Sequence, residues 1–177
     1  MIYKEEVRDL FTVPQGYNLA HCISADFNLG GGIAKQFCKH FNMRERLLNY
    51  YGDGVKGAGF ALTISNVYNL VTKEKVSDRP TYENLINALT DMKEDMVDTG
   101  VKKIAMPKIG CGLDGLNWNI VRSIIKEVFE DTDIEILICI REDEKEQEDA
   151  EEDMEEDEIN QDFLDVLQAT LDLFSKK

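Results

Sequence analysis

Residues 106–118 read Met-Pro-Lys-Ile-Gly-Cys-Gly-Leu-Asp-Gly-Leu-Asn-Trp, and this stretch decides which fold the rest of the chain can take. An apolar run typical of a β-strand, residues 101–106, leads into it, and a helical pattern over residues 117–130 follows it. Glycines at such a junction let backbone N–H groups close on an anion, and the helix N-terminus adds a favourable dipole. Asp114 lies inside the loop, beside the start of the helix. The pattern favours a phosphate-binding loop, with an ordinary turn between strand and helix as the alternative.

A second glycine cluster lies earlier in the chain. Residues 17–24 form a largely apolar run of strand length, which leads through Ala-Asp-Phe-Asn-Leu to three glycines at 30–32 and then to a helical pattern over 33–41. Consecutive glycines are costly in a regular element, so they indicate a sharp turn or a close approach of the backbone to a ligand. A glycine linker is the alternative here. Two strand–glycine–helix units in one α/β chain converge on one crevice at the carboxyl ends of the strands.

The remaining patterns define the fold class. We expect further strands over 1–7, 59–64, 67–72 and 133–140, a hairpin turn at Ser65-Asn66, and helices over 43–51 and 81–97. Thr81 is suited to cap the start of the second helix and Gly100 to end it. Strands that alternate with helices predict an α/β domain whose mostly parallel or mixed sheet is covered on both sides.

Charge is distributed unevenly along the 177 residues, whose net charge is −15. Residues 1–140 carry 16 basic and 19 acidic side chains, whereas residues 141–158 carry 2 basic and 13 acidic ones. A near-neutral domain with an acidic arm lacks the clustered Lys and Arg that non-specific duplex binding needs. We therefore expect one domain over 1–141 and, because like charges repel, a disordered or transiently helical acidic linker over 142–158.

Apolar residues recur at helical spacing over 159–175, which predicts an amphipathic C-terminal helix. Its apolar face has three open uses: packing back onto its own domain, self-association, or binding a protein partner. A membrane surface is not an expected partner, because the polar face is acidic.

Cys22, Cys38, Cys111 and Cys139 form no C-x-x-C pair, and the sequence holds two histidines. Neither a zinc site, another metal site nor a disulfide framework is therefore expected, and no cofactor is indicated. Reduced thiols and the absence of a signal-like or long apolar segment predict a soluble, cytoplasmic protein.

Several motifs together resemble the macrodomain family, and within it the terminal ADP-ribose protein glycohydrolase branch. They are Asp9-Leu10-Phe11, His21-Cys22-Ile23-Ser24 before the glycines, Thr72-Lys73, the Pro80–Leu85 stretch, and the Met106–Asp114 loop. The resemblance covers about residues 1–141 and implies a three-layer α/β/α fold with a mixed, mostly parallel six-stranded sheet. It also implies that ADP-ribose, or an ADP-ribosylated protein or nucleic acid, is the partner.

The same resemblance implies roles for individual residues. Asp9 would accept a hydrogen bond from the adenine amino group, the main chain of 109–113 would hold the pyrophosphate, and Ser24 with the three glycines would face the distal ribose. The full set of implied ligand-binding residues is Asp9, Leu10, Ser24, Gly30, Gly31, Gly32, Ile33, Lys108, Ile109, Gly110, Cys111, Gly112 and Leu113. For Asp9, capping a turn is the alternative.

Lys73 and Asp114 are the catalytic residues that the resemblance implies. The lysine would attack the anomeric carbon of the distal ribose, and the aspartate would act as general acid and base. An amine is a nucleophile only when deprotonated, and a nearby carboxylate is suited to take its proton. Lys75, two residues further on, is the rival lysine.

The chain departs from the family pattern at two places. Arg8 replaces the usual glycine before Asp9, and Cys139 and Arg141 occupy the end of the last strand, where an aromatic side chain near adenine is expected. The resemblance implies a hydrolase that releases ADP-ribose from Glu or Asp esters or from O-acyl-ADP-ribose. Because Gly-Gly-Gly-Ile-Ala also resembles the phosphatases that act on ADP-ribose 1″-phosphate, that activity is the alternative, as is a non-catalytic ADP-ribose reader.

Overall fold

The computed structural model describes residues 1–152, 168 and 172. Its strands are β1 (Ile2–Val7), β2 (Asn18–Ser24), β3 (Phe60–Ile64), β4 (Val67–Lys73), β5 (Lys103–Met106) and β6 (Glu135–Ile140). Its helices are η1 (Leu10–Thr12, a 3-10 turn), α1 (Gly32–Phe41), α2 (Met43–Tyr51), α3 (Tyr82–Thr99), α4 (Trp118–Phe129) and α5 (Glu142–Glu152). The strands and helices expected over residues 1–140 are confirmed to within a few residues at each end.

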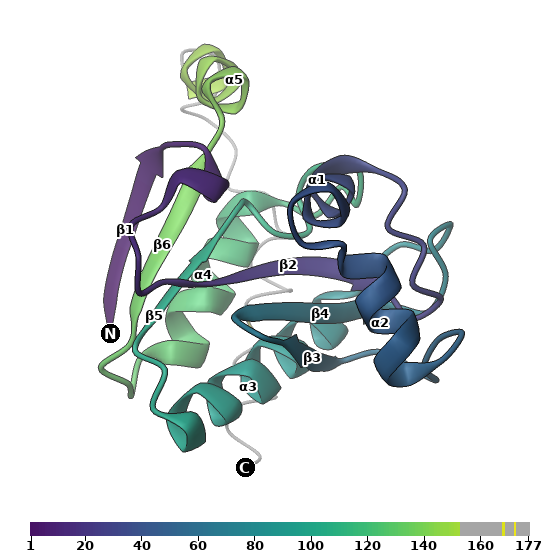
Figure 1. The fold of residues 1–177 in the computed structure, drawn as a ribbon. Coiled ribbons are helices and arrows are strands. Elements are labelled where there is room, and N and C mark those ends of the chain that lie inside the picture. Colours follow the sequence, from purple (N-terminus) through teal and green to yellow (C-terminus); the bar gives the residue numbers. More distant parts are fainter. Residues whose placement is uncertain (153–167, 169–171, 173–177) are drawn as a thin grey trace.

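The six strands form one mixed sheet in the order β1-β6-β5-β2-β4-β3 (Figure 1). Every neighbouring pair is parallel except β3 with β4, which is antiparallel. The predicted hairpin joins that pair, and Ser65 at its tip has φ +54°, as tight two-residue hairpin turns require. The parallel strands therefore all end at the same edge of the sheet.

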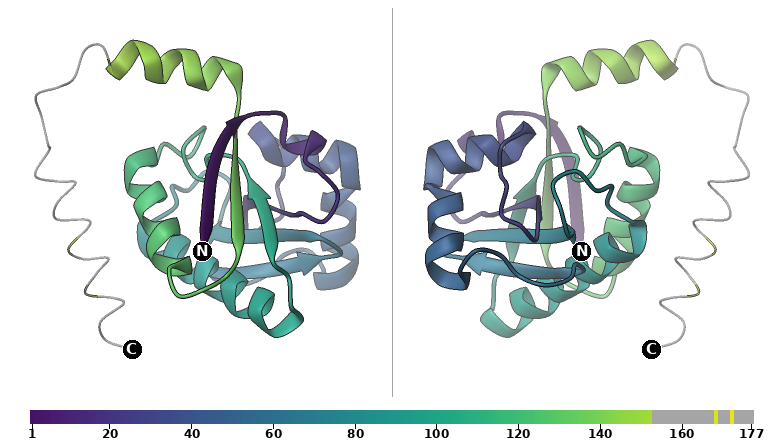
Figure 2. Two further views of the ribbon diagram at one scale, coloured as in Figure 1. Left: turned by 90° about the vertical axis from the view of Figure 1, so that its left-hand side faces the viewer. Right: turned by 90° about the vertical axis from the view of Figure 1, so that its right-hand side faces the viewer.

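Helices cover both faces of the sheet, which confirms the three-layer architecture (Figures 1 and 2). In β4, Tyr68 and Leu70 pack into the layer formed with α3 and α4, whereas Val67 and Val71 pack into the layer beneath α1 and α2. This alternation follows from the two-residue repeat of a strand. β4 is buried on both faces, and the polar Asn69 in its middle is paired with His21 Nε2 at 2.7 Å.

The helix boundaries follow the sequence signals. Thr81 Oγ1 accepts a hydrogen bond from the Asn84 N–H at 3.1 Å, and Gly100 ends α3 in the left-handed conformation. Asn117 caps α4, with its side-chain oxygen 2.9 Å from the Asn119 N–H. This cap fixes the point where the second glycine loop becomes helix.

The first eleven residues of the acidic arm, for which a disordered or transiently helical segment was expected, form α5. Glutamate favours helices, and the acidic side chains of the first turn interact well with the positive end of the helix dipole. The Arg141 N–H donates to Glu144 Oε2 at 3.1 Å, which caps the start of α5. Figure 2 shows α5 leaving β6 and extending away from the sheet. The rest of the arm and the predicted helix over 159–175 lie outside the described residues, apart from positions 168 and 172, and the domain boundaries stay a prediction.

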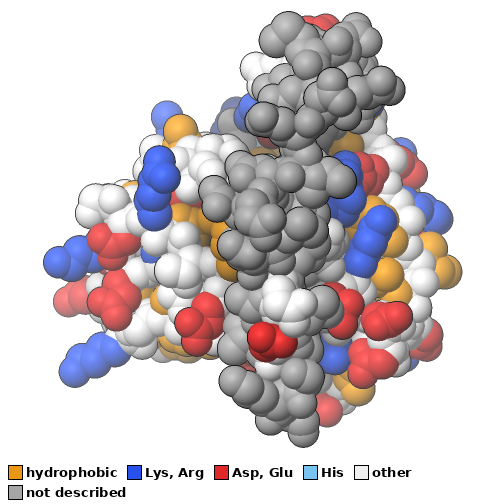
Figure 3. Space-filling view, turned by 180° about the vertical axis from the view of Figure 1, so that it is seen from behind, with side chains coloured by type: hydrophobic (Ala, Val, Ile, Leu, Met, Phe, Trp, Pro, Cys, Tyr) orange, Lys and Arg blue, Asp and Glu red, His pale blue; other side chains and the backbone are white. Residues whose placement is uncertain are grey.

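Lys and Arg side chains are interspersed with acidic ones on the face shown in Figure 3 and form no continuous basic patch there. None of the helices that the structure describes combines the length and apolar character needed to cross a bilayer.

Candidate active site

The carboxyl ends of the parallel strands bring the predicted site residues to one edge of the sheet. Asp9 follows β1, Ser24 ends β2, Lys73 ends β4, and the loop 107–117 follows β5. Four inter-strand steps separate β1 from β4, which corresponds to roughly 19 Å at the usual strand spacing. This edge is therefore long enough for an elongated ligand rather than a compact one.

Lys73 and Asp114 form an ion pair at this edge. Lys73 Nζ lies 2.6 Å from Asp114 Oδ1, and the two side chains are 12% and 18% exposed. Lys73 Nζ also donates to the Val76 carbonyl oxygen at 3.1 Å. The register of β2 against β4 shifts at Ser24, so that Ser24 lies opposite Lys73. Lys75, the rival lysine, is exposed.

The two glycine loops meet at Leu113. Its side chain is 86% exposed and lies over Gly31 and Gly32 of the first loop. In the part of the chain that the structure describes, the N–H groups of Gly31, Gly112 and Leu113 donate to no backbone carbonyl. These amides are thus available to oxygen atoms of a ligand, as the phosphate-loop interpretation requires.

Gly110 shapes the second loop. It has φ +71°, and a Cβ at this position would come within 2.8 Å of Leu116 Cδ1. The Leu116 N–H donates to the Gly110 carbonyl at 2.8 Å, which closes the loop on itself. The buried Ile109 anchors its start, and the half-buried Cys111 donates its thiol to the Ile109 carbonyl at 3.2 Å.

Asp26 is a residue of the site that sequence reasoning missed. Its carboxylate accepts hydrogen bonds from Ser24 Oγ (2.5 Å), the Asn28 N–H (3.1 Å) and the Val76 N–H (3.0 Å). Burial opposes ionisation, but these three donors and the positive charge of Lys73 together hold the pKa of Asp26 below its ordinary value. The only sequence signal was an acid placed directly between an apolar strand and a glycine cluster.

Asp9 caps the first turn. Its Oδ1 accepts from the Phe11 N–H at 2.8 Å, and the neighbouring Leu10 is buried. Phe11 stacks on His40 of α1 with ring centroids 4.1 Å apart. The capping role given as the alternative for Asp9 is therefore present, and it leaves the other carboxylate oxygen for a ligand.

The end of β6 supplies no aromatic side chain. Cys139 is buried, and Arg141 is exposed and pairs with Asp143 at 3.0 Å. Arg8 extends the β1–β6 ladder through its N–H and pairs with Glu6 at 3.4 Å.

Two further titratable groups, Cys22 and His21, lie in β2. Burial raises the pKa of the Cys22 thiol, and the Asp114 carboxylate raises it further, so Cys22 stays protonated. Burial lowers the pKa of His21 to about 4, although its hydrogen bond to Asn69 acts in the opposite direction. His21 stacks on Phe37 with centroids 3.8 Å apart and is a neutral core residue.

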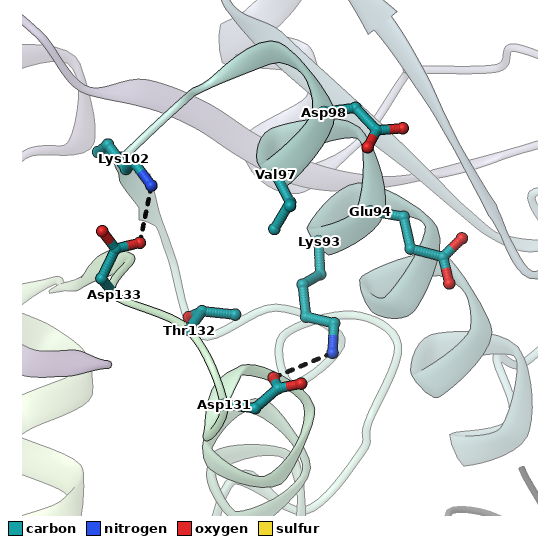
Figure 4. Close-up of a pocket in the computed structure, with 8 residues that line it drawn as sticks. All are labelled: Lys93, Glu94, Val97, Asp98, Lys102, Asp131, Thr132 and Asp133. Carbon is teal, nitrogen blue, oxygen red and sulfur yellow. Dashed lines mark hydrogen bonds and ion pairs between the residues drawn. The ribbon is translucent and has the colours of Figure 1, made fainter.

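Two hollows on the surface lie apart from the Lys73–Asp114 pair and the glycine loops, although Leu10 lines one of them. One of about 800 Å³ lies between the end of α3 and the loop before β6 (Figure 4), and ion pairs such as Lys93–Asp131 at 3.2 Å line it. It opens at the amino ends of the strands, opposite the glycine loops. Another, of about 300 Å³, lies beside η1 and the end of α1. No three His, Cys, Asp or Glu side chains within the described ranges gather to hold a metal ion.

The fold and the paired glycine loops at one sheet edge define the class. A family model described as Macro domain matches residues 20–125, and the chain belongs to this family. The ADP-ribose glycohydrolase OARD1 of Bos taurus is 45% identical over 130 residues, which span 73% of this chain and 86% of that protein, and the Homo sapiens protein of the same name matches equally.

Solved structures agree on the fold. The macrodomain of Thermus aquaticus DarG has a TM-score of 0.70 at 21% identity and covers 78% of this chain and 97% of that chain. Thermosipho africanus DarTG in complex with ADP-ribose has a TM-score of 0.59 at 17% identity and covers 73% of this chain and 39% of that chain.

Proposed function

We propose that this macrodomain binds ADP-ribose and hydrolyses its ester bond to an acyl group, on a Glu or Asp side chain of a protein or in O-acyl-ADP-ribose. The observation that carries the proposal is the 2.6 Å contact between Lys73 Nζ and Asp114 Oδ1 beside two glycine loops. The relatives named ADP-ribose glycohydrolase support it, as does a structural neighbour solved with ADP-ribose.

The ligand would lie along the carboxyl edge of the sheet. Its adenine would lie at Asp9, its diphosphate would be held by backbone N–H groups of the two glycine loops, and its distal ribose would lie next to Lys73. Amides and a helix N-terminus suit a diphosphate, because they offer donors without a side chain to desolvate. A carboxylate suits the adenine amino group, because it only accepts hydrogen bonds.

Two displacements account for the reaction. Asp114 takes a proton from Lys73, and the free amine attacks C1″ of the distal ribose. The new N–C1″ bond forms as the C1″–O bond breaks, the bonding electron pair leaves with the carboxylate of the acyl group, and Asp114 gives that carboxylate the proton it took from Lys73. Water then attacks C1″, the N–C1″ bond breaks, and the water's proton passes through Asp114 to the lysine. The net products are free ADP-ribose and the carboxylic acid.

The test is the release of ADP-ribose from a protein mono-ADP-ribosylated on Glu or Asp, read by mass. We expect Lys73→Ala and Asp114→Ala each to lower kcat by about a hundredfold or more. Lys75→Ala is the matched control, because Lys75 lies two residues away and is exposed. Equal turnover in all these variants would remove the pair from the mechanism.

The same panel should include ADP-ribose 1″-phosphate. Release of inorganic phosphate that needs Asp114 but not Lys73 would identify a phosphatase instead. Binding of ADP-ribose without turnover of any substrate would identify a reader.

A further inference from the structure

Asp26 and Lys73 both form hydrogen bonds with the main chain of Val76. The Val76 N–H donates to Asp26 Oδ2 at 3.0 Å, and the Val76 carbonyl accepts from Lys73 Nζ at 3.1 Å. The Val76 side chain is 43% exposed, so packing alone does not fix this part of the loop. The position of the carbonyl that holds Lys73 therefore depends on the Asp26 carboxylate.

The other oxygen of Asp26 organises the approach to the first glycine loop. Oδ1 accepts from Ser24 Oγ at 2.5 Å and from the Asn28 N–H at 3.1 Å. An ionised carboxylate can accept all three donors, whereas an amide side chain would turn a donor group toward one of them. In Asp26→Asn the amide oxygen can still accept from Ser24 and Asn28, so that the amide NH2 group meets the Val76 N–H and the disturbance falls on the lysine segment.

The turn that carries Asp26 is held in a costly conformation. Phe27 is buried with φ +53°, its N–H donates to the Ser24 carbonyl, and Arg44 Nε donates to the Phe27 carbonyl at 3.1 Å. The Val55 N–H donates to the Ala25 carbonyl at 2.9 Å from a third segment. Conformations of this kind persist where the surroundings over-determine them, and they cluster at functional sites.

We propose that Asp26 is a positioning residue for Lys73: it fixes Val76, and the Val76 carbonyl directs the lysine amine toward Asp114 and the anomeric carbon. The inference rests on the proposed function, because it assigns Lys73 as the nucleophile. Asp26 itself touches no reacting atom. It couples the loop that binds the ligand to the side chain that attacks it.

The kinetic test compares Asp26→Asn with Asp78→Asn. Asp78 is the matched control, since its carboxylate accepts from the Lys75 N–H at 3.0 Å in the same loop without reaching Lys73. We expect Asp26→Asn to lower kcat by about tenfold or more, because it removes a charge-assisted hydrogen bond. The Kd for ADP-ribose should change by less than about threefold, and Asp78→Asn should leave kcat within about twofold.

A second measurement does not depend on activity. The extent of acylation of Lys73, normalised to Lys75 and read by mass spectrometry, should rise in Asp26→Asn and not in Asp78→Asn. Hydrogen exchange should be faster in the peptide that contains Val76. Unchanged labelling of Lys73 and unchanged exchange at Val76 in Asp26→Asn would overturn the proposal. A fall in kcat accompanied by a similar fold-loss of ADP-ribose affinity and by a lower melting temperature would also overturn it. If the wild type released ADP-ribose from no substrate, the proposed function would fail, whereas labelling and exchange would still report on the link from Asp26 to Lys73.

Discussion

Leu113 of the second glycine loop lies directly over Gly31 of the first, so that a Cβ added to Gly31 would come within 3.1 Å of Leu113 Cδ1. Gly31 and Leu113 are separated by more than eighty positions in the chain, yet they bring the two glycine loops together. Since Leu113 is largely exposed and its tip can move, Gly31 is open to substitution in the free protein. A glycine is required at position 31 because of the space above it, and not because of the backbone conformation at that position.

Substitutions at Gly110 and Gly31 should therefore affect different quantities, the free energy of unfolding and ADP-ribose binding respectively. Gly110→Ala should destabilise the protein by about 1–2 kcal/mol, because the new Cβ meets Leu116 and φ is positive. Gly31→Val should leave the free energy of unfolding nearly unchanged and weaken ADP-ribose binding by about tenfold, since its side chain would cover backbone N–H groups proposed to bind the diphosphate. Urea unfolding and titration calorimetry measure the two quantities. A large loss of stability in Gly31→Val would contradict this division.

The Lys73–Asp114 pair should behave as a coupled unit in stability as well as in turnover. Removing Lys73 alone leaves a largely buried carboxylate without its counter-ion, whereas the double variant Lys73→Met/Asp114→Asn removes both charges. We expect a coupling free energy of about 1 kcal/mol from a double-mutant cycle by urea unfolding. Additive losses would mean that solvent screens the pair.

The sequence predicted the fold because its strongest signals are local. Apolar runs, the Thr81 cap and the Gly100 stop each act within one element, and the structure agrees with them. The two glycine loops were also predicted to converge, since parallel strands end at one edge of a sheet.

Other parts of the site depend on contacts that periodicity does not encode. Asp26 reads as a turn residue in sequence, and its importance comes from Val76, which lies fifty positions further on. The Arg122–Glu5 pair, 2.6 Å between Nε and Oε1, likewise joins α4 to β1 across the chain. For the start of the acidic arm, charge repulsion predicted a disordered or transiently helical segment, and the helix propensity of glutamate favours the helix α5.

His21 should make stability depend on pH in a definite direction. Its pKa is lowered to about 4 in the folded state by burial, against about 6.5 in the unfolded chain. The unfolded state therefore binds more protons, so that the contribution is complete above about pH 6.5 and is lost as the pH falls toward 4. Between pH 7 and 5.5 this amounts to about 1 kcal/mol. Urea unfolding at both pH values should show the loss in wild type and a smaller one in His21→Gln. An equal loss in both proteins would assign the effect to another group.

Truncation after residue 141 should preserve the domain. The last strand ends at Ile140, and α5 extends away from the sheet. We expect a melting temperature within about 3 °C of the full chain, because α5, the helix of the arm that the structure describes, extends away from the sheet. A change in oligomeric state by light scattering would show that the predicted helix over 159–175 mediates self-association. A large fall in melting temperature would show instead that it packs on its own domain.

ADP-ribose should stabilise the folded protein. A ligand that binds only the native state raises the free energy of unfolding by an amount set by its concentration relative to Kd. At a hundred times Kd this gain is about 2.7 kcal/mol, which corresponds to a rise of several degrees in the melting temperature. Asp9→Ala should reduce the rise by removing the carboxylate proposed for adenine, and AMP should give a smaller rise because it lacks the distal ribose. Adenosine alone tests the diphosphate contribution, since it lacks the group that the glycine loops would bind. A melting temperature that ADP-ribose leaves unmoved in the intact chain would remove the basis for every catalytic role assigned to Lys73 and Asp114.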